Sequence, residues 1–154
     1  MHIIVATDGS KQSLAAARYA RNVLDPAKVT DVSVVAVLRP LAAVAFADDL
    51  SPDDRARVGL ESASFRAAAE SSLRVVAEVF AGWGPQVHRR IRSGSPANEL
   101  IKAARSLEAG LVVVAAGGRG LSESVLIGST AQRVQGSAPC PVLVVRPTPR
   151  RKRG

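Results

Sequence analysis

The segment LVVVAAGGRG, residues 111–120, places an uninterrupted aliphatic run directly before a glycine-rich loop. Runs of this kind are typical of parallel strands that are covered on both faces of a sheet. The glycines that follow expose backbone N–H groups and remove the side chains that would block a close approach. The segment therefore predicts an α/β protein and makes the carboxyl end of this strand a candidate anion site.

Strand-like and helix-like patterns alternate on both sides of this segment. Further short strands are predicted at 3–6, 32–38, 86–93 and 142–145. Residues with helical periodicity fall at 11–24, 53–81, 96–109 and 130–135, and within 53–81 Phe65 and Val76 mark one side of the expected helix. The run 86–93 alternates between apolar and charged residues, which predicts a sheet edge. Five strands with intervening helices predict a single domain with a doubly wound parallel sheet and right-handed crossovers.

Several residues predict where these elements begin and end. Ser95 and Pro96 are expected to open a helix, as its N-cap and first residue. Gly110 is expected to end the same helix. Residues 39–54 have no clear periodicity and are expected to run over the surface. Trp83 is expected to cover the core.

The composition limits the classes of protein to be considered. Of the 154 residues, 47% are hydrophobic and 3% are aromatic, so we expect a core of aliphatic residues. No apolar run approaches the roughly 20 residues that cross a membrane, and the first residues lack the pattern of a signal peptide. The lone cysteine, Cys140, can form no internal disulfide or cysteine cluster and is expected to pack as a small hydrophobe. We therefore expect a cytoplasmic protein.

The positive charge is concentrated at one end of the chain. The net charge is +8, and residues 150–153 supply four of these charges. We expect a domain over 1–147 and a disordered basic tail over 148–154. A solvated tail is favoured over a nucleic-acid contact, because terminal runs of like charge repel each other.

Sequence motifs exclude several enzyme classes. The chain has no Walker A pattern and no Gly-x-Gly-x-x-Gly after the first strand. Its two histidines, His2 and His88, are expected to lie away from the glycine-rich loop and from the loop that follows the first strand. This placement argues against a Ser/His/Asp arrangement. We therefore assign no catalytic residue.

Two loops are candidates for ligand binding. Asp8 follows the first strand and can accept hydrogen bonds from a base or a ribose, or can serve only as a turn residue. Gly128, Ser129 and Thr130 open a helix whose free N–H groups and dipole favour phosphate. The alternative there is an ordinary link with a serine cap. The residues alone leave both alternatives open.

Four motifs together resemble the universal stress protein family. They are the opening IIVATDGS at 3–10, SGSP at 93–96, GSTAQRV at 128–134 and APCPVLVV at 138–145. The likeness covers nearly the whole chain, and residues 39–54 are its variable part.

This resemblance implies a fold and an assembly. It implies a five-stranded parallel sheet in the order 3-2-1-4-5, of the type shared with adenine-nucleotide α-hydrolases. It also implies a homodimer formed through the last strand. Many members bind ATP, which can be accompanied by Mg²⁺, and other members bind no nucleotide.

The nucleotide-binding pattern of the family is matched in part. The pattern is Gly, two residues, Gly, nine residues, then Gly and Ser or Thr. Gly118, Gly128 and Ser129 fit its second half, but Ala115 replaces the first glycine. The resemblance therefore implies a nucleotide-responsive dimer with at most weak ATP hydrolysis, with a nucleotide-free scaffold dimer as the alternative.

Position by position, the resemblance also implies a set of site residues. Asp8 would meet the base or ribose, and Val37 would line the adenine pocket, bordered by Ala6 and Thr7. The phosphates would lie near the remaining candidates, which are Ala115, Gly117, Gly118, Arg119, Gly128, Ser129 and Thr130.

Overall fold

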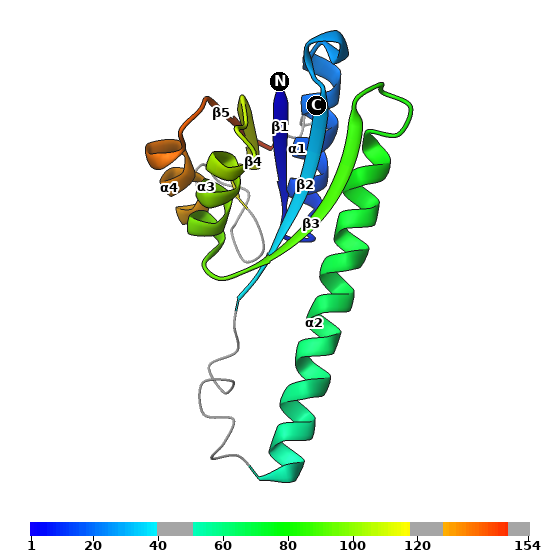
Figure 1. Ribbon diagram of the computed structural model, residues 1–154, viewed down its shortest axis with the longest axis vertical. Helices are drawn as coiled ribbons and strands as arrows, with labels where there is room; N and C mark the ends of the chain where they lie inside the picture. Colours follow the sequence, from blue (N-terminus) through cyan, green and yellow to red (C-terminus); the bar gives the residue numbers. More distant parts are fainter. Residues whose placement is uncertain (40–50, 118–127, 148–154) are drawn as a thin grey trace, which may run out of the picture.

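The computed structural model describes residues 1–39, 51–117 and 128–147, which form a five-stranded sheet in the order β3-β2-β1-β4-β5 (Figure 1). All paired strands are parallel. The elements are β1 (His2–Thr7), α1 (Lys11–Val23), a 3₁₀ turn (Pro26–Lys28), β2 (Asp31–Leu38), α2 (Pro52–Val79), β3 (Gln86–Ser93), α3 (Pro96–Ser106), β4 (Leu111–Ala115), α4 (Ser129–Ser137) and β5 (Val142–Val145). The predicted fold and strand order are confirmed.

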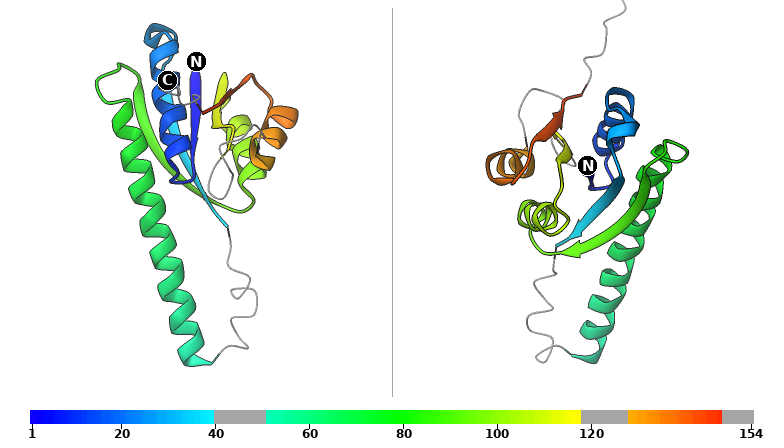
Figure 2. Two further views of the ribbon diagram at one scale, coloured as in Figure 1. Left: turned by 180° about the vertical axis from the view of Figure 1, so that it is seen from behind. Right: turned by 45° about the horizontal axis from the view of Figure 1, so that its top comes forward.

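Two layers of helices cover the sheet. Figure 2 shows α1 and α2 on one face and α3 and α4 on the other. The buried side chains between the sheet and α1 and α2 form one hydrophobic cluster (the α1–α2 cluster), and those between the sheet and α3 and α4 form a second (the α3–α4 cluster). Successive residues of a strand point to opposite faces, so Ile3 and Val5 belong to the α1–α2 cluster and Ile4 belongs to the α3–α4 cluster. All three are fully buried, which explains the unbroken aliphatic run of β1.

The charged strand β3 lies at the sheet edge, as predicted. Its residues Val87 and Ile91 pack against the α1–α2 cluster. The alternate positions His88, Arg90 and Arg92 are only partly buried, because α3 and α4 cover mainly the other half of that face.

The ends of α3 differ in part from the prediction. Ser95 occupies the N-cap and Pro96 begins the helix, but the Ser95 side chain makes no capping hydrogen bond. The helix ends at Ser106, before Gly110, and Glu108 takes the left-handed conformation with φ of 50°. Gly110 instead permits a close contact, because an added Cβ would lie 2.9 Å from the Cβ of Met1.

The first part of α2 extends beyond the end of the sheet (Figure 1). Sequence periodicity placed Phe65 on the same side of this helix as Val76, yet Phe65 is 54% exposed. The buried contacts come from Leu73, Val76 and Phe80, which lie beside the strands. Helical periodicity alone cannot show where a long helix leaves the body of the protein.

The C-terminal end of α2 is held by the neighbouring helix. The guanidinium of Arg21 in α1 donates a hydrogen bond of 2.6 Å to the carbonyl oxygen of Val79. Just beyond, the ring centroids of Phe80 and Trp83 lie 5.4 Å apart. Trp83 packs against the core, as predicted. Within the described residues, no helix has the length and apolar character needed to span a membrane.

Candidate functional site

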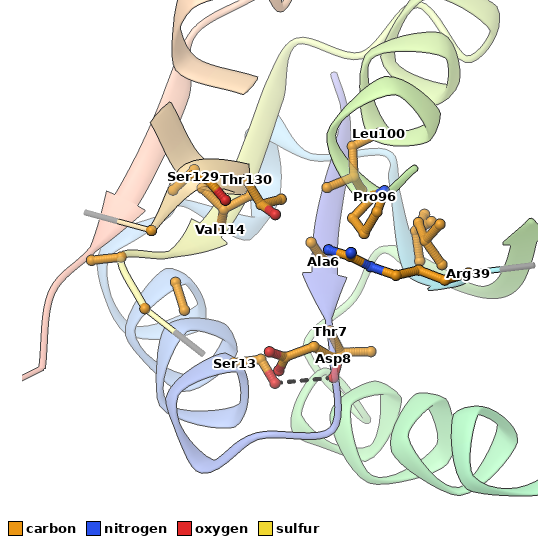
Figure 3. Close-up of a pocket in the computed structure, with 17 residues that line it drawn as sticks. Ala6, Thr7, Asp8, Ser13, Arg39, Pro96, Leu100, Val114, Ser129 and Thr130 are labelled. Atoms are coloured by element: carbon orange, nitrogen blue, oxygen red, sulfur yellow. Dashed lines mark hydrogen bonds between the residues drawn. The ribbon is translucent and has the colours of Figure 1, made fainter. Parts of the chain in front are cut away.

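A cavity of about 590 Å³ lies at the carboxyl ends of β1, β2 and β4 (Figure 3). Parallel sheets commonly bind ligands at this end. Nine of the predicted site residues line the cavity: Ala6, Thr7, Asp8, Val37, Ala115, Gly117, Gly128, Ser129 and Thr130. The other two, Gly118 and Arg119, lie outside the described residues. The fold therefore brings together two loops that are more than 100 residues apart in the chain.

The start of α4 offers backbone donors to the cavity. Gly128 is the N-cap, and no side chain of the described residues caps this helix. The first intrahelical bond runs from Gln132 N–H to the Gly128 carbonyl oxygen, so the N–H groups of residues 129–131 have no partner in the part of the chain described. The Gly128 N–H itself donates to the Ala116 carbonyl oxygen. The available donors therefore begin one residue later than the glycine of the motif.

The methyl group of Ala115 is directed largely toward the α1–α2 layer. Along β4, Leu111, Val113 and Ala115 alternate with Val112 and Val114, and Ala115 packs against the α1–α2 cluster. The cavity opens between the strands and the opposite layer. The replacement of the first motif glycine by alanine is therefore a smaller obstacle than the sequence alone implies.

The hydroxyl group of Thr7 belongs to the turn between β1 and α1. It is buried, lies 3.0 Å from the Ser13 hydroxyl oxygen, and accepts a hydrogen bond from the Gly9 N–H. Gly9 has a φ of 79°, a conformation that glycine adopts at little cost. Thr7 thus lines the cavity while its polar group holds the loop that carries Asp8.

One oxygen atom of the Asp8 carboxylate accepts a hydrogen bond within the turn, and the other does not. Asp8 Oδ1 accepts a 2.9 Å hydrogen bond from the Ser10 N–H, which is the turn role considered from the sequence. The residue is exposed, and Oδ2 has no partner among the residues that the structure covers. Asp8 can therefore stabilise the turn and contact a ligand at the same time, because the turn uses only one of its carboxylate oxygens.

Several residues of the cavity wall were not predicted as site residues. Pro96 and Leu100 bring the first turns of α3 against the cavity. Arg39 follows the last residue of β2, and its side chain turns back toward Ala6 and Pro96 (Figure 3). Its position two residues after Val37 was the available signal. It was missed because Arg39 was assigned to the irregular surface segment.

The connection from β3 to α3 is fixed by an ion pair. Arg92 Nε lies 3.0 Å from Glu99 Oε2, and this hydrogen bond is the main reason that the pKa of Glu99 is lowered. Gly94, with φ of 143°, passes so close to Glu99 that an added Cβ would lie 2.8 Å from Oε1. These contacts set the position of Pro96 at the cavity.

The model of the Universal stress protein family matches residues 1–146. The chain belongs to this family. A universal stress protein of Methanocaldococcus jannaschii is 34% identical to it over 152 residues, which cover 94% of this chain and 81% of the relative.

Solved structures show the same fold. The universal stress protein UspA from Lactobacillus plantarum has a TM-score of 0.78 and 24% identity, and the match covers 95% of this chain and 97% of that one. A universal stress protein in complex with cAMP has a TM-score of 0.69 and 22% identity, over 96% and 98% of the two chains. At these identities the likeness concerns the fold.

This universal stress protein also has a polar cluster at the amino ends of its strands. His2 Nε2 lies 2.7 Å from the Ser33 hydroxyl oxygen, to which Arg90 Nε donates at 3.0 Å. His88 Nε2 contacts Asp31 Oδ1 at 2.9 Å. The histidines thus lie outside the cavity, as predicted. The contact between His2 and Ser33 was not predicted from the sequence. Ser33 is fully buried, so its hydroxyl cannot reach a substrate.

Other reactive groups offer little to the site. Cys140 is half-buried and packs against the α3–α4 cluster, much as predicted, and burial raises the pKa of its thiol. The thiolate is therefore disfavoured at neutral pH. In the ranges 1–39, 51–117 and 128–147, no group of three or more histidine, cysteine, aspartate or glutamate residues is arranged to hold a metal ion.

Proposed function

We propose that this universal stress protein binds an adenine nucleotide in the cavity at the carboxyl ends of β1, β2 and β4, and that it acts as a nucleotide-responsive dimer in the stress response. The observation that carries the proposal is the uncapped start of α4, whose free N–H groups face the same cavity as Asp8. A volume of about 590 Å³ falls within the range of small-molecule sites.

The chemistry of the cavity wall suits the parts of a nucleotide. The N–H groups of residues 129–131 and the hydroxyl groups of Ser129 and Thr130 suit phosphate oxygens, aided by the dipole of α4. Val37, Pro96 and Leu100 form an apolar wall for a base, and the free oxygen of Asp8 suits a ribose hydroxyl or an amino group. The solved relative in complex with cAMP supports an adenine nucleotide as the ligand class.

ATP is the nucleotide that we propose, because its triphosphate would extend from the start of α4 toward the loop after β4. Mg²⁺ would enter with the triphosphate. Among the described residues, no general base lines the α4 end of the cavity, so we expect hydrolysis to be weak at most. Steady phosphate release above background that is lost in Ser129→Ala would contradict this expectation.

Isothermal titration with ATP and AMP tests the proposal. We expect dissociation constants in the micromolar range or weaker, and nucleotide in the mass spectrum of material released by denaturation. The matched variant is Gly128→Val, because the φ of −59° and ψ of 154° at Gly128 suit valine while its side chain would crowd the start of α4. An absence of heat and of thermal shift at millimolar ATP would refute nucleotide binding.

A dimer scaffold that binds no nucleotide is the second candidate, and Ala115 is the observation that favours it. Ala115→Gly separates the two candidates, because it restores the spacing of the family motif. If Ala115 were what prevents binding, this variant alone would bind ATP. Equal affinities of the variant and the wild type would reject this explanation.

We propose that the dimer forms through β5 and that the protein acts in the cytoplasm. β5 is an edge strand, and all four of its residues are partly exposed despite being apolar. An edge of this kind is available for pairing with a second chain. Sedimentation equilibrium should give twice the mass of the chain at micromolar concentration, and a monomer at all concentrations would contradict the proposed assembly.

A further inference from the structure

Arg39 is the one cationic side chain among the described residues that line the cavity. It stands directly after β2, where the chain leaves the sheet. Its guanidinium makes no hydrogen bond or ion pair within the described residues, although it is directed back over the strand ends (Figure 3). A planar group with five N–H donors is therefore presented to the cavity without a protein partner.

The surroundings of this guanidinium are apolar. Figure 3 shows the side chain running toward Ala6 and Pro96, with Leu100 of α3 on the same side of the cavity. Val37 lines the same wall, two residues earlier in β2. This part of the cavity therefore suits the flat, weakly polar surface of a heterocyclic base.

The phosphate-binding groups lie at a different part of the wall. Ser129 and Thr130 are on the far side of Ala6 from Arg39 in Figure 3, next to Val114 of β4. A nucleotide with its phosphates at the start of α4 would thus extend its base toward β2 and α3. Arg39 would meet that base rather than the phosphates.

We propose that Arg39 binds the base of the nucleotide, by stacking its guanidinium plane on the purine ring above the wall formed by Ala6, Val37 and Pro96. This inference rests on the proposed function and adds a residue that determines affinity for the base. Guanidinium groups stack on aromatic faces more readily than ammonium groups because they are planar and weakly hydrated. A cation–π contact in a partly desolvated site corresponds to about a five- to tenfold change in affinity.

The proposal predicts how the effect of Arg39 depends on the ligand. A contact with the base contributes equally to adenosine, AMP and ATP. A contact with phosphate contributes nothing to adenosine and grows with the number of phosphates, and it weakens strongly with added salt. The dependence on phosphate number therefore separates the two roles.

The experiment compares the wild type, Arg39→Gln and the control Arg89→Gln in titrations with adenosine, AMP and ATP at low and high salt. Arg89 is an exposed residue of β3 outside the cavity, so its replacement removes the same charge elsewhere. Dissociation constants and the amide shifts of residues 129–131 are measured by NMR on ¹⁵N-labelled protein. Because Arg39 is exposed, the variant is expected to fold normally, which the same spectra show.

We expect Arg39→Gln to weaken the binding of all three ligands about five- to tenfold, at either salt concentration, while Arg89→Gln leaves it unchanged. The amide shifts at the start of α4 on ATP addition should remain. Unchanged affinity in Arg39→Gln, or a loss that increases from adenosine to ATP, would overturn the proposal and leave the nucleotide site intact. If the wild type binds none of the ligands, the proposed function itself fails, and this inference fails with it.

Discussion

Gly94 shows how strongly the placement of α3 depends on a single residue. Its φ of 143° is unfavourable for any side chain, and an added Cβ would lie 2.8 Å from Glu99 Oε1. We expect Gly94→Ala to lower the free energy of unfolding by about 1–3 kcal/mol and to weaken ligand binding, because Pro96 would move. Urea denaturation measures the first effect and nucleotide titration the second.

Gly59→Ala is the matched control for this substitution. Gly59 lies inside α2, has no atom within 4 Å of an added Cβ and has no positive φ. The same change should therefore stabilise the protein by about 0.5–1 kcal/mol. A similar loss of stability in both variants would show that the contact with Glu99 is not the cause.

His2 should make stability depend on pH in the mildly acidic range. Burial is the main cause that lowers the pKa of His2 below 6.5, assisted by Arg90 and His88 and opposed by Asp31. Arg90 can only donate, so the Ser33 hydroxyl is free to donate its own hydrogen to a neutral His2. The folded state therefore binds fewer protons than the unfolded state between the two pKa values.

The stability supplied by neutral His2 is thus complete above the unfolded pKa of 6.5 and decreases as the pH falls from there toward the folded pKa. The melting temperature should fall between pH 7.5 and 5.5, and His2→Asn should reduce this fall. Identical pH profiles for the wild type and the variant would exclude His2 as the source.

At the scale of elements, α2 contains two leucines with opposite environments. Leu73 is 3% exposed and packs against the sheet, whereas Leu60 is 73% exposed in the part of the helix that extends past it. Leu73→Ala should lower the free energy of unfolding by about 2–5 kcal/mol. Leu60→Ala should change it by less than about 0.5 kcal/mol. Comparable losses in chemical denaturation would mean that the exposed part of α2 has a packing partner.

The strands and most helices could be predicted because each buries a regular face. β1, β2 and β4 are covered on both sides, so their aliphatic runs are unambiguous. The end of α3 was misplaced because Glu108, rather than a glycine, takes the left-handed conformation. Phe65 was misplaced because the pattern of α2 continues where there is no sheet to cover.

The cavity could be predicted in outline from its two loops and from the family resemblance. What the sequence could not show is which polar groups are already used within the protein. The Thr7 hydroxyl is hydrogen-bonded to the Ser13 hydroxyl and the Gly9 N–H, and the Gly128 N–H donates a hydrogen bond to the Ala116 carbonyl oxygen. The direction of the Arg39 side chain depends on how the chain leaves β2, and no local pattern encodes that.

At the scale of the whole molecule, we propose that residues 1–147 are the folding unit and that the basic tail 148–154, which lies outside the described residues, is dispensable for folding. Deleting 148–154 should leave the melting temperature and nucleotide affinity unchanged, because residues up to 145 already form the two core clusters that the structure describes. Differential scanning calorimetry and titration test this. A lower melting temperature would place the tail within the folded domain, and reduced retention on DNA at low salt would show a contact with nucleic acid.

Because β1 is the central strand, the ribosome completes one side of the sheet long before the other. β1, β2 and β3 can pair with one another once residues 1–93 have been synthesised. The other edge of β1 must wait for β4, which begins at residue 111 and itself pairs with β5 at 142–145. A nascent chain that stops before α4 therefore has the apolar wall beside β1 and β2 but not the start of α4, so the nucleotide site that we propose would be complete only when synthesis of the domain is complete.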